Sequence, residues 1–197
     1  MPPSPNLQRR RALADAAVEV LGTSGIHGLS HRAVDVRAGL PPGTTSNYFR
    51  NRDALLEAAA RRAMELHQAD MVAAREPGGA AADRERLIEL IAVSLHRAAT
   101  EHRVRYLAIY ELTMESTRRP ALRGVLAGIA GGALDFTVEH HRDLDLSTTR
   151  EQVGMLITLY GGTLFTLVTA PERALTLEDV RPLARAVVIG GTAAAEA

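Results

Sequence analysis

The segment Thr44–Tyr48 carries hydroxyl and amide side chains at nearly every position. Such groups bind phosphate oxygens and base edges alike. Asn47 has an amide that can pair with two atoms of adenine in the major groove of DNA. Upstream, Arg9–Arg11 can reach a neighbouring groove or phosphates as a basic arm. These residues therefore indicate nucleic-acid recognition. The alternatives are that Thr44–Tyr48 is a solvated polar turn and that Arg9–Arg11 is a solvated tail.

Patterns for catalysis and metal binding are missing from the sequence. Without Cys there is no disulfide framework, thiolate metal site or Cys nucleophile. Two adjacent histidines, His140 and His141, would point about 100° apart on a helix and cannot ligate one ion from one face. His67 and Asp70 are three residues apart, but no third ligand is placed beside them. We therefore expect a protein that is not an enzyme and that holds no metal and no cofactor.

The charge distribution fits a DNA-binding head on a neutral body. The 197 residues include 23 basic and 23 acidic side chains, so the formal net charge is zero. Residues 1–70 carry 9 Arg and 7 acids, a net charge of +2, and the remainder carries 14 Arg and 16 acids. The asymmetry is small, but its sign is that of a nucleic-acid-binding N-terminal part.

Apolar residues recur at helical spacing through most of the chain, and few windows alternate with a period of two. This pattern predicts an all-α fold. Gly and Pro clusters and candidate caps divide the chain, with two candidate capping boxes at Thr148–Glu151 and Thr176–Asp179. The expected helices span about residues 7–24, 30–38, 43–49, 51–75, 83–100, 103–117, 120–142, 148–169 and 177–190.

Two short helices around Ala38-Gly39-Leu40 predict a helix-turn-helix. Ala38 allows close helix approach, Gly39 can adopt a positive φ, and Leu40 can fill the gap beneath the turn. In this motif the second helix enters the major groove while the first crosses the DNA backbone. We expect residues 1–52 to form the DNA-binding domain and residues 53–197 to form a second, helical domain.

The motif resembles the N-terminal signature of the TetR-type transcriptional regulators. The shared positions are Arg32, Val34, Ala38-Gly39-Leu40, Gly43-Thr44, Tyr48-Phe49, Arg52-Asp53 and Leu55-Leu56. The resemblance covers about residues 7–60. It implies a homodimeric repressor that binds a palindromic double-stranded DNA operator and is released by a small-molecule effector. It also implies that residues 53–197 form the effector-binding and dimerisation domain, with dimerisation through the last two helices.

The same resemblance assigns DNA contacts by position. Phosphate contacts fall to Ser30, Arg32, Thr44, Tyr48 and Arg52, and base contacts fall to Pro42, Thr45 and Asn47. The family usually has an aromatic residue where Ser46 stands, so a phosphate contact at this position would come from a shorter side chain. It usually has a small residue where Asp35 stands. A carboxylate on the inner side of that helix needs a partner, and Arg37 and Arg50 are the candidates.

The C-terminal body offers candidates for an effector pocket and a dimer interface. Glu111 is an acidic residue flanked by apolar residues. A buried acid is unusual outside functional sites, so Glu111 is a candidate for the pocket. The pocket candidates are Tyr106, Tyr110, Glu111, Met114, Phe136, His140 and Tyr160, each of which could instead be plain core. Each of Gly161 and Gly162 costs about 1 kcal/mol of helix propensity, which close helix approach in a dimer would offset. The interface candidates are Ile157, Gly161, Gly162, Leu164, Leu167, Val180, Leu183 and Val187.

The longest apolar stretches are interrupted by Arg, Gly and Thr and fall short of the roughly 20 unbroken apolar residues of a membrane span. We therefore expect a cytoplasmic protein without membrane contact. Two alternatives to a ligand-responsive regulator stay open. One is an all-α enzyme that uses the three-helix unit only as a scaffold. The other is a DNA-binding regulator without a small-molecule ligand, switched by a partner protein.

Overall fold

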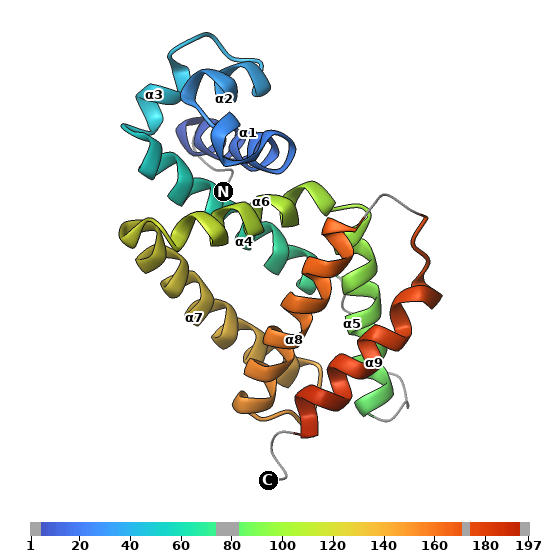
Figure 1. Ribbon diagram of the computed structural model, residues 1–197. Coiled ribbons are helices and arrows are strands. Elements are labelled where there is room, and N and C mark those ends of the chain that lie inside the picture. The colour runs from blue at the N-terminus through green and yellow to red at the C-terminus, as the bar shows by residue number, and fades with distance from the viewer. Residues whose placement is uncertain (1–4, 74–82, 171–173, 194–197) are drawn as a thin grey trace. The chain divides into compact units, whose positions relative to one another are not determined.

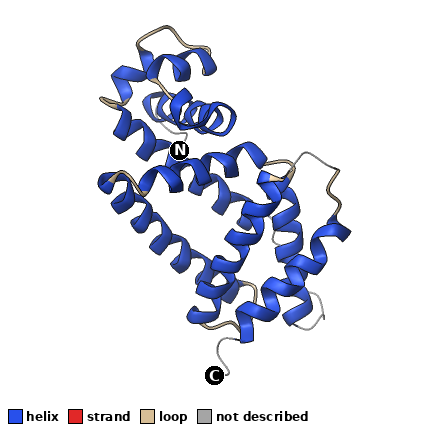
Figure 2. Cartoon of the chain, viewed as in Figure 1, coloured by secondary structure: helices blue, strands red, loops and turns tan. Residues whose placement is uncertain are grey.

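A computed structural model describes residues 5–73, 83–170 and 174–193, and in these ranges the only regular secondary structure is α-helix (Figure 1; Figure 2). The all-α prediction is confirmed. The helices are α1 Pro5–Gly28, α2 His31–Arg37, α3 Thr44–Tyr48, α4 Arg52–Ala73, α5 Asp83–Ala99, α6 Arg103–Ser116, α7 Pro120–Asp143, α8 Arg150–Thr169 and α9 Leu177–Ala193.

The chain divides into two compact units, each of which is built from two separate segments of the chain. Unit 1 holds the chain up to His67 together with Val104–Ile129, and unit 2 holds Gln68–Arg103 together with the chain from Ala130. Consequently α4 and α7 each contribute to both units, and α6 belongs with the N-terminal helices. This is a division by packing, and the functional boundary at residue 52 stays a prediction.

The core of unit 1 is built from one apolar face of each of α1 to α4. Leu13 and Leu21 of α1, Val34 of α2, Phe49 after α3 and Leu56 of α4 are each at most 1% exposed. Residues on α6 and α7, among them Leu112 and Leu122, complete the same cluster. The short α2 and α3 are thus held by tertiary packing, which supplies most helix stability in proteins.

A kink at Gly25 divides the span Pro5–Gly28 of α1 into two helical parts. The φ of +66° and ψ of −177° at Gly25 are not helical, so the predicted end of the first helix near residue 24 is confirmed. Such a backbone conformation suits glycine because it lacks a Cβ. One turn earlier, α6 approaches α1 so closely that a Cβ on Gly22 would lie 2.0 Å from the Val104 carbonyl oxygen.

In unit 2, α5, α8 and α9 pack against one another. Arg181 and Arg185 of α9 form bidentate ion pairs with Glu89 and Glu85 of α5 at 2.9 to 3.2 Å. These exposed pairs align two helices but stabilise them little. A Cβ on Gly191 would lie 2.5 Å from the Leu156 side chain, so the close approach of α8 and α9 occurs at this glycine.

Side-chain caps define the starts of α8 and α9. Thr149 and Gln152 form a reciprocal capping box at α8, one residue later than the sequence predicts. At α9, Thr176 and Asp179 form the expected box. Satisfying these backbone groups fixes where each helix begins.

Two helices of the described chain, α7 and α8, have the length and hydropathy of a membrane span. Only 6% and 22% of their most apolar windows are buried within this chain. Length and composition alone do not define a span, because the core helix of a water-soluble protein passes the same test. Most of the apolar surface of these two windows is left exposed by the rest of the described chain.

Candidate nucleic-acid interface

The helix-turn-helix lies in unit 1 and consists of α2, a turn and α3. Ser30 caps α2: its Oγ accepts a hydrogen bond from the Ala33 N–H at 3.1 Å. Gly39 and Gly43 have φ values of +64° and +88°, which turns the chain between the helices. The positive φ expected at Gly39 is confirmed.

One side of this motif is open to solvent and polar. Arg32, Pro42, Ser46 and Asn47 are exposed. No ion pair ties the Arg32 guanidinium to another part of the described chain. An unpaired cation beside exposed amide and hydroxyl groups is what contact with a phosphate backbone and base edges requires.

Thr45 lies on the opposite side of α3 and is fully buried. Its N–H and its hydroxyl both donate to Oδ1 of Asp35, at 2.7 and 2.6 Å. The base contact expected of Thr45 therefore finds no support, because the side chain faces the core. Asp35 also finds other partners than expected: Arg37 pairs with Glu19 on α1 instead.

Thr44 and Tyr48 flank the exposed side of α3 and are half-buried. The Thr44 hydroxyl donates to the Pro41 carbonyl at 2.6 Å, so it holds the turn. Tyr48 packs partly against the core of unit 1. The phosphate contacts of Thr44 and Tyr48 remain predictions. Both side chains are partly exposed, and each hydroxyl can turn its hydrogen toward a phosphate oxygen.

Arg52 is engaged within the head. Its Nη1 donates to the Leu29 carbonyl at 2.6 Å, and its Nη2 donates to the Ile26 carbonyl. A half-buried guanidinium that binds two backbone carbonyls closes the junction between α1 and α2. This geometry favours a structural role for Arg52 over the expected phosphate contact.

Arg9–Arg11, expected to form a basic arm, lie in helix α1, which begins at Pro5, so they are part of the helix and not a separate arm. Arg10 donates from Nη1 to the Tyr48 carbonyl at 3.2 Å, and its guanidinium carbon lies 4.8 Å from the centre of the Phe49 ring. Arg10 therefore lies beside the end of α3. Arg9 and Arg11 are exposed on either side of Arg10.

Glu111, expected in an effector pocket, binds the head instead. Its Oε2 accepts a hydrogen bond of 2.9 Å from the Ile26 N–H. On the same helix, the buried Tyr106 places its hydroxyl 2.7 Å from Nδ1 of His67. Burial, together with neighbouring Tyr106, raises the pKa of Tyr110 to about 12, so its phenol stays neutral. Met114 is exposed.

The other three pocket candidates lie in unit 2. Phe136 and His140 stack on α7 with ring centroids 6.0 Å apart. Tyr160 of α8 places its hydroxyl 2.8 Å from the Ser94 Oγ of α5. Since the seven candidates divide between the two units, a shared effector pocket remains a prediction.

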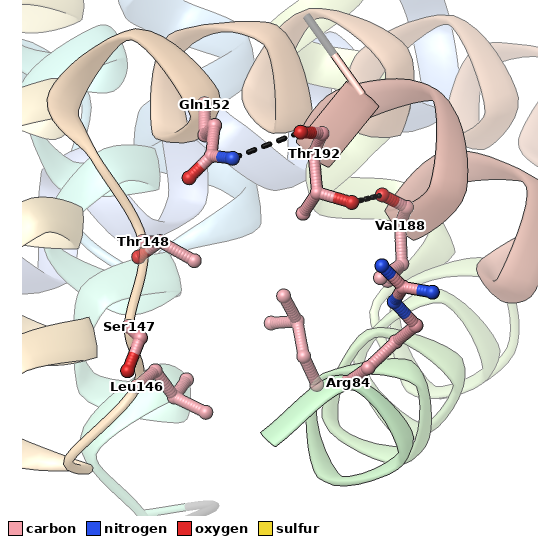
Figure 3. Close-up of a pocket in the computed structure, with 8 residues that line it drawn as sticks. Arg84, Leu146, Ser147, Thr148, Gln152, Val188 and Thr192 are labelled. Atoms are coloured by element: carbon pink, nitrogen blue, oxygen red, sulfur yellow. Dashed lines mark hydrogen bonds between the residues drawn. The ribbon is translucent and has the colours of Figure 1, made fainter. Parts of the chain in front are cut away.

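A hollow in unit 2 lies where α5 begins and where α8 and α9 meet (Figure 3). It has a volume of about 200 Å³, below the roughly 300 Å³ at which pockets for drug-sized ligands begin. Its polar lining is partly engaged, because Nε2 of Gln152 donates to the Thr192 carbonyl. None of the seven pocket candidates lines this hollow.

The interface candidates on α8 and α9 separate into two sets. Leu164, Val180 and Val187 are at most 3% exposed, so they belong to the core of unit 2 and not to an outer face. Ile157, Gly162 and Leu183 are exposed, and Gly161 and Leu167 are half-buried. Met155, Phe165 and Ile189 are also exposed and apolar but were not among the predicted interface residues. Helical spacing alone does not distinguish the two sides of a largely apolar helix.

Comparison with known families matches most of the described chain in two parts. Residues 13–59 match the model of bacterial regulatory proteins of the tetR family. Residues 82–190 match the tetracyclin repressor-like C-terminal domain. A helix-turn-helix head followed by this body defines the class: a DNA-binding transcriptional regulator. The chain belongs to the TetR family, whose members are regulators and not enzymes.

Relatives and solved structures agree with this assignment. The regulator BetI of Rhizobium meliloti (strain 1021) is 34% identical over 120 residues, which are 60% of this chain and 57% of that protein. The chain thus spans little more than half the length of this relative. EbrR, a multidrug binding protein solved with ethidium, is 31% identical with a TM-score of 0.66, over 93% of this chain and 98% of EbrR. A TetR-family member from Streptomyces coelicolor A3 is 32% identical with a TM-score of 0.66, over 91% and 98%.

Proposed function

We propose that the protein is a ligand-responsive transcriptional repressor that binds a palindromic operator as a homodimer. The observation that carries the proposal is the open side of the helix-turn-helix, where Arg32, Pro42, Ser46 and Asn47 are exposed together. Ser46 and Asn47 lie on α3, the helix that enters the major groove in this motif. Arg32 lies on α2, which crosses the backbone.

The proposed DNA contacts fall into two groups. Asn47 and Ser46 read base edges, with Pro42 beside them at the start of the helix. Arg32 binds phosphate, assisted by Ser30, Thr44 and Tyr48 at the edges of the motif. Thr45 and Arg52 support the head from inside and are left out of the contact set.

Dimerisation through α8 and α9 follows from the uncovered apolar faces of these helices. Phe165 and Ile189 are 46% and 51% exposed, and Ile157 and Leu183 are 38% and 40% exposed. A Cβ on Gly161 or Gly162 would meet nothing within 4 Å in this chain, so these glycines leave room for a second copy. A two-fold dimer places the same patch on both subunits and presents two recognition helices to the two halves of a palindrome.

The ligand is proposed by analogy with EbrR. That protein has been solved with ethidium, proflavin, malachite green and imidazole. An effector that binds better to the DNA-free state must lower the affinity for the operator, by reciprocal linkage. Cytoplasmic localisation belongs to the same proposal, because the operator is there.

The direct test is selection of binding sites from random duplex DNA. We expect enrichment of a sequence with two inverted half-sites whose centres lie about 10 base pairs, or a multiple of this, apart. The four EbrR ligands are then added to the complex with the selected duplex. Failure to enrich any sequence would contradict the DNA-binding proposal, and enrichment without inverted symmetry would contradict the dimer.

A further inference from the structure

Two residues of α2 contact the two ends of α3. His31 and Asp35 are four residues apart and therefore lie on one face of α2. Asp35 binds the turn and the first residues of α3, and His31 binds the residue that follows its last turn. Neither residue belongs to the DNA contacts proposed above.

At the N-terminal end of α3, the Asp35 carboxylate accepts three hydrogen bonds. Oδ2 accepts from the Gly43 N–H at 2.8 Å, and Oδ1 accepts from both donors of Thr45. The residue at the helix start, Gly43, has no side chain to cap α3. Asp35 therefore acts as a cap supplied from another helix, and its negative charge suits a helix N-terminus.

At the C-terminal end, Nε2 of His31 lies 2.7 Å from the Phe49 carbonyl oxygen. A carbonyl only accepts, so Nε2 carries the hydrogen and donates it. The imidazole thus gives a partner to one of the carbonyls that a helix end leaves free. The two contacts place an acceptor at the helix start and a donor at its end.

We infer that His31 and Asp35 act as a clamp that fixes the rotation of α3 and so determines which side chains it presents to DNA. The inference rests on the proposed DNA binding and adds two positioning residues to it. A helix of five residues cannot hold its own orientation, because isolated helices below about 12 residues are marginal.

The rotation follows from the helical repeat. Successive side chains of an α-helix differ by about 100°, so Thr45 lies about 100° from Ser46 and about 160° from Asn47. Holding Thr45 against Asp35 consequently turns Ser46 and Asn47 outward, and both are exposed. Loss of the clamp would leave α3 in contact with DNA but without one fixed set of base-reading side chains.

The charge state of Asp35 agrees with its role as an acceptor. Burial would raise its pKa, but the hydrogen bonds from Thr45 and Gly43, with a smaller effect of His31, lower it below the ordinary value. The carboxylate is ionised at neutral pH and can accept from all three donors. An amide in its place keeps one acceptor oxygen and points an NH2 group at the Gly43 N–H or at the Thr45 N–H, each of which is itself a donor.

The variants that test the clamp each change the hydrogen bonding of one side chain. Asp35→Asn keeps the shape but replaces one of the two acceptor oxygens with an NH2 donor and removes the negative charge, and Thr45→Val removes only the hydroxyl. His31→Phe removes the donor, whereas His31→Gln retains an N–H and should rescue it. Glu57→Gln is the matched control, because Glu57 is also a carboxylate and pairs with Arg61 within α4.

Two measurements are made on each folded variant. The first is amide hydrogen exchange at Gly43 and Thr45, which needs no DNA. The second is the ratio of affinities for the selected duplex and a random duplex. We expect Asp35→Asn to speed exchange at least tenfold at whichever of the two amides faces the new NH2 group, and to lower the affinity ratio at least tenfold, with the dependence on salt unchanged. His31→Phe and Thr45→Val should shift the ratio in the same direction, and His31→Gln and Glu57→Gln should retain wild-type values.

The outcomes separate the clamp from the function on which it rests. Unchanged exchange in both Asp35→Asn and Thr45→Val would overturn the clamp, whatever the DNA result. Faster exchange with an unchanged affinity ratio would overturn its role in specificity. If Asp35→Asn does not fold, Thr45→Val and His31→Phe provide the same comparison. A wild-type protein that enriches no site would instead refute the proposed function, and exchange alone would then decide the hydrogen-bonding part of the clamp.

Discussion

The Glu111 carboxylate of α6 accepts a hydrogen bond from the Ile26 N–H at 2.9 Å, just after the bend that Gly25 makes in α1. The carbonyl of the same Ile26 accepts from Arg52 of α4. Both backbone polar groups of one residue are therefore held by side chains from other helices. Through this residue, α6 and α4 fix the position of the α1–α2 junction.

The first prediction concerns the stability of this junction. Glu111→Ala should lower the free energy of unfolding by about 1–3 kcal/mol, because it leaves a partly buried N–H without its acceptor. Glu111→Gln keeps an acceptor oxygen, so its free energy of unfolding should fall by less. Urea unfolding followed by circular dichroism measures both, with Glu101→Ala, at an exposed position, as the control. Equal midpoints for Glu111→Ala and wild type would show that the contact contributes nothing.

The second prediction separates two arginines. Arg32→Ala should reduce the slope of log K against log salt by about 0.9, the value for one phosphate contact on duplex DNA. Arg52→Ala should change that slope little and should instead lower stability, because two backbone carbonyls lose their donor. Salt titrations of operator binding and urea unfolding of both variants decide between the roles. A flatter slope for Arg52→Ala at wild-type stability would restore Arg52 to the phosphate contacts.

The third prediction concerns base readout. Asn47→Ala should relax the preference at one position of each half-site, since a good base contact contributes about 1–3 kcal/mol of discrimination. Ser46→Ala should act in the same way but more weakly, through one hydroxyl. Binding-site selection with each variant shows the change. If both retain the wild-type consensus at every position, α3 does not read bases through these side chains.

The fourth prediction tests the dimer. Gly162→Leu should weaken dimerisation without lowering protomer stability, because a side chain at this glycine meets nothing within 4 Å in its own chain. Gly124→Leu, at an exposed glycine of α7 with equal free space, is the matched control. Sedimentation at micromolar concentration reports the assembly state. A monomeric wild type, or a Gly162→Leu variant that dimerises as tightly, would refute the interface.

The fifth prediction follows from a buried histidine in unit 2. His141 is 8% exposed, its Nδ1 lies 2.8 Å from the Thr148 Oγ1, and burial, with a smaller effect of His140, lowers its pKa to about 4. Between pH 6.5 and 4 the unfolded chain therefore binds a proton that the folded chain does not. Stability should fall as pH decreases through this window, by up to about 3 kcal/mol. Unfolding of His141→Gln should show a flatter dependence than wild type or the exposed-site variant His27→Gln, and parallel curves would contradict this.

Local chemistry made much of the head predictable. Gly39 provides a positive φ, Ser30 caps α2, and the apolar positions of α1 and α4 follow the helical repeat. These features depend on neighbours a few residues apart, so the sequence displays them directly. The capping box at Thr176 and Asp179 was predictable for the same reason.

Contacts between distant segments were not predictable. Asp35 was expected to need a cation, but a carboxylate is equally satisfied by the N–H and hydroxyl donors of Thr45. Glu111 was noted as an acid among apolar residues, yet its partner is a backbone N–H 85 residues away. The sequence shows that a polar residue among apolar neighbours will need a hydrogen-bonding partner when it is buried. Which partner it has is determined only by the tertiary packing.

The same limit applies to α8 and α9. Leu164 and Phe165 are adjacent and both apolar, but the first is 1% exposed and the second 46%. Because these helices are apolar around most of their circumference, helical spacing identifies no single inner face. The side of α8 that faces inward is defined only by the packing of α5 and α9 against it.

The central claim is that two copies of this chain bind one symmetric DNA site. Native mass spectrometry of the protein with the selected duplex tests it most directly, with a duplex carrying a single half-site as the comparison. We predict two protomers, or an even number, on the full site, and much weaker occupancy of the half-site at the same concentrations. A single protomer on the full site, with equal affinity for the half-site, would contradict the claim.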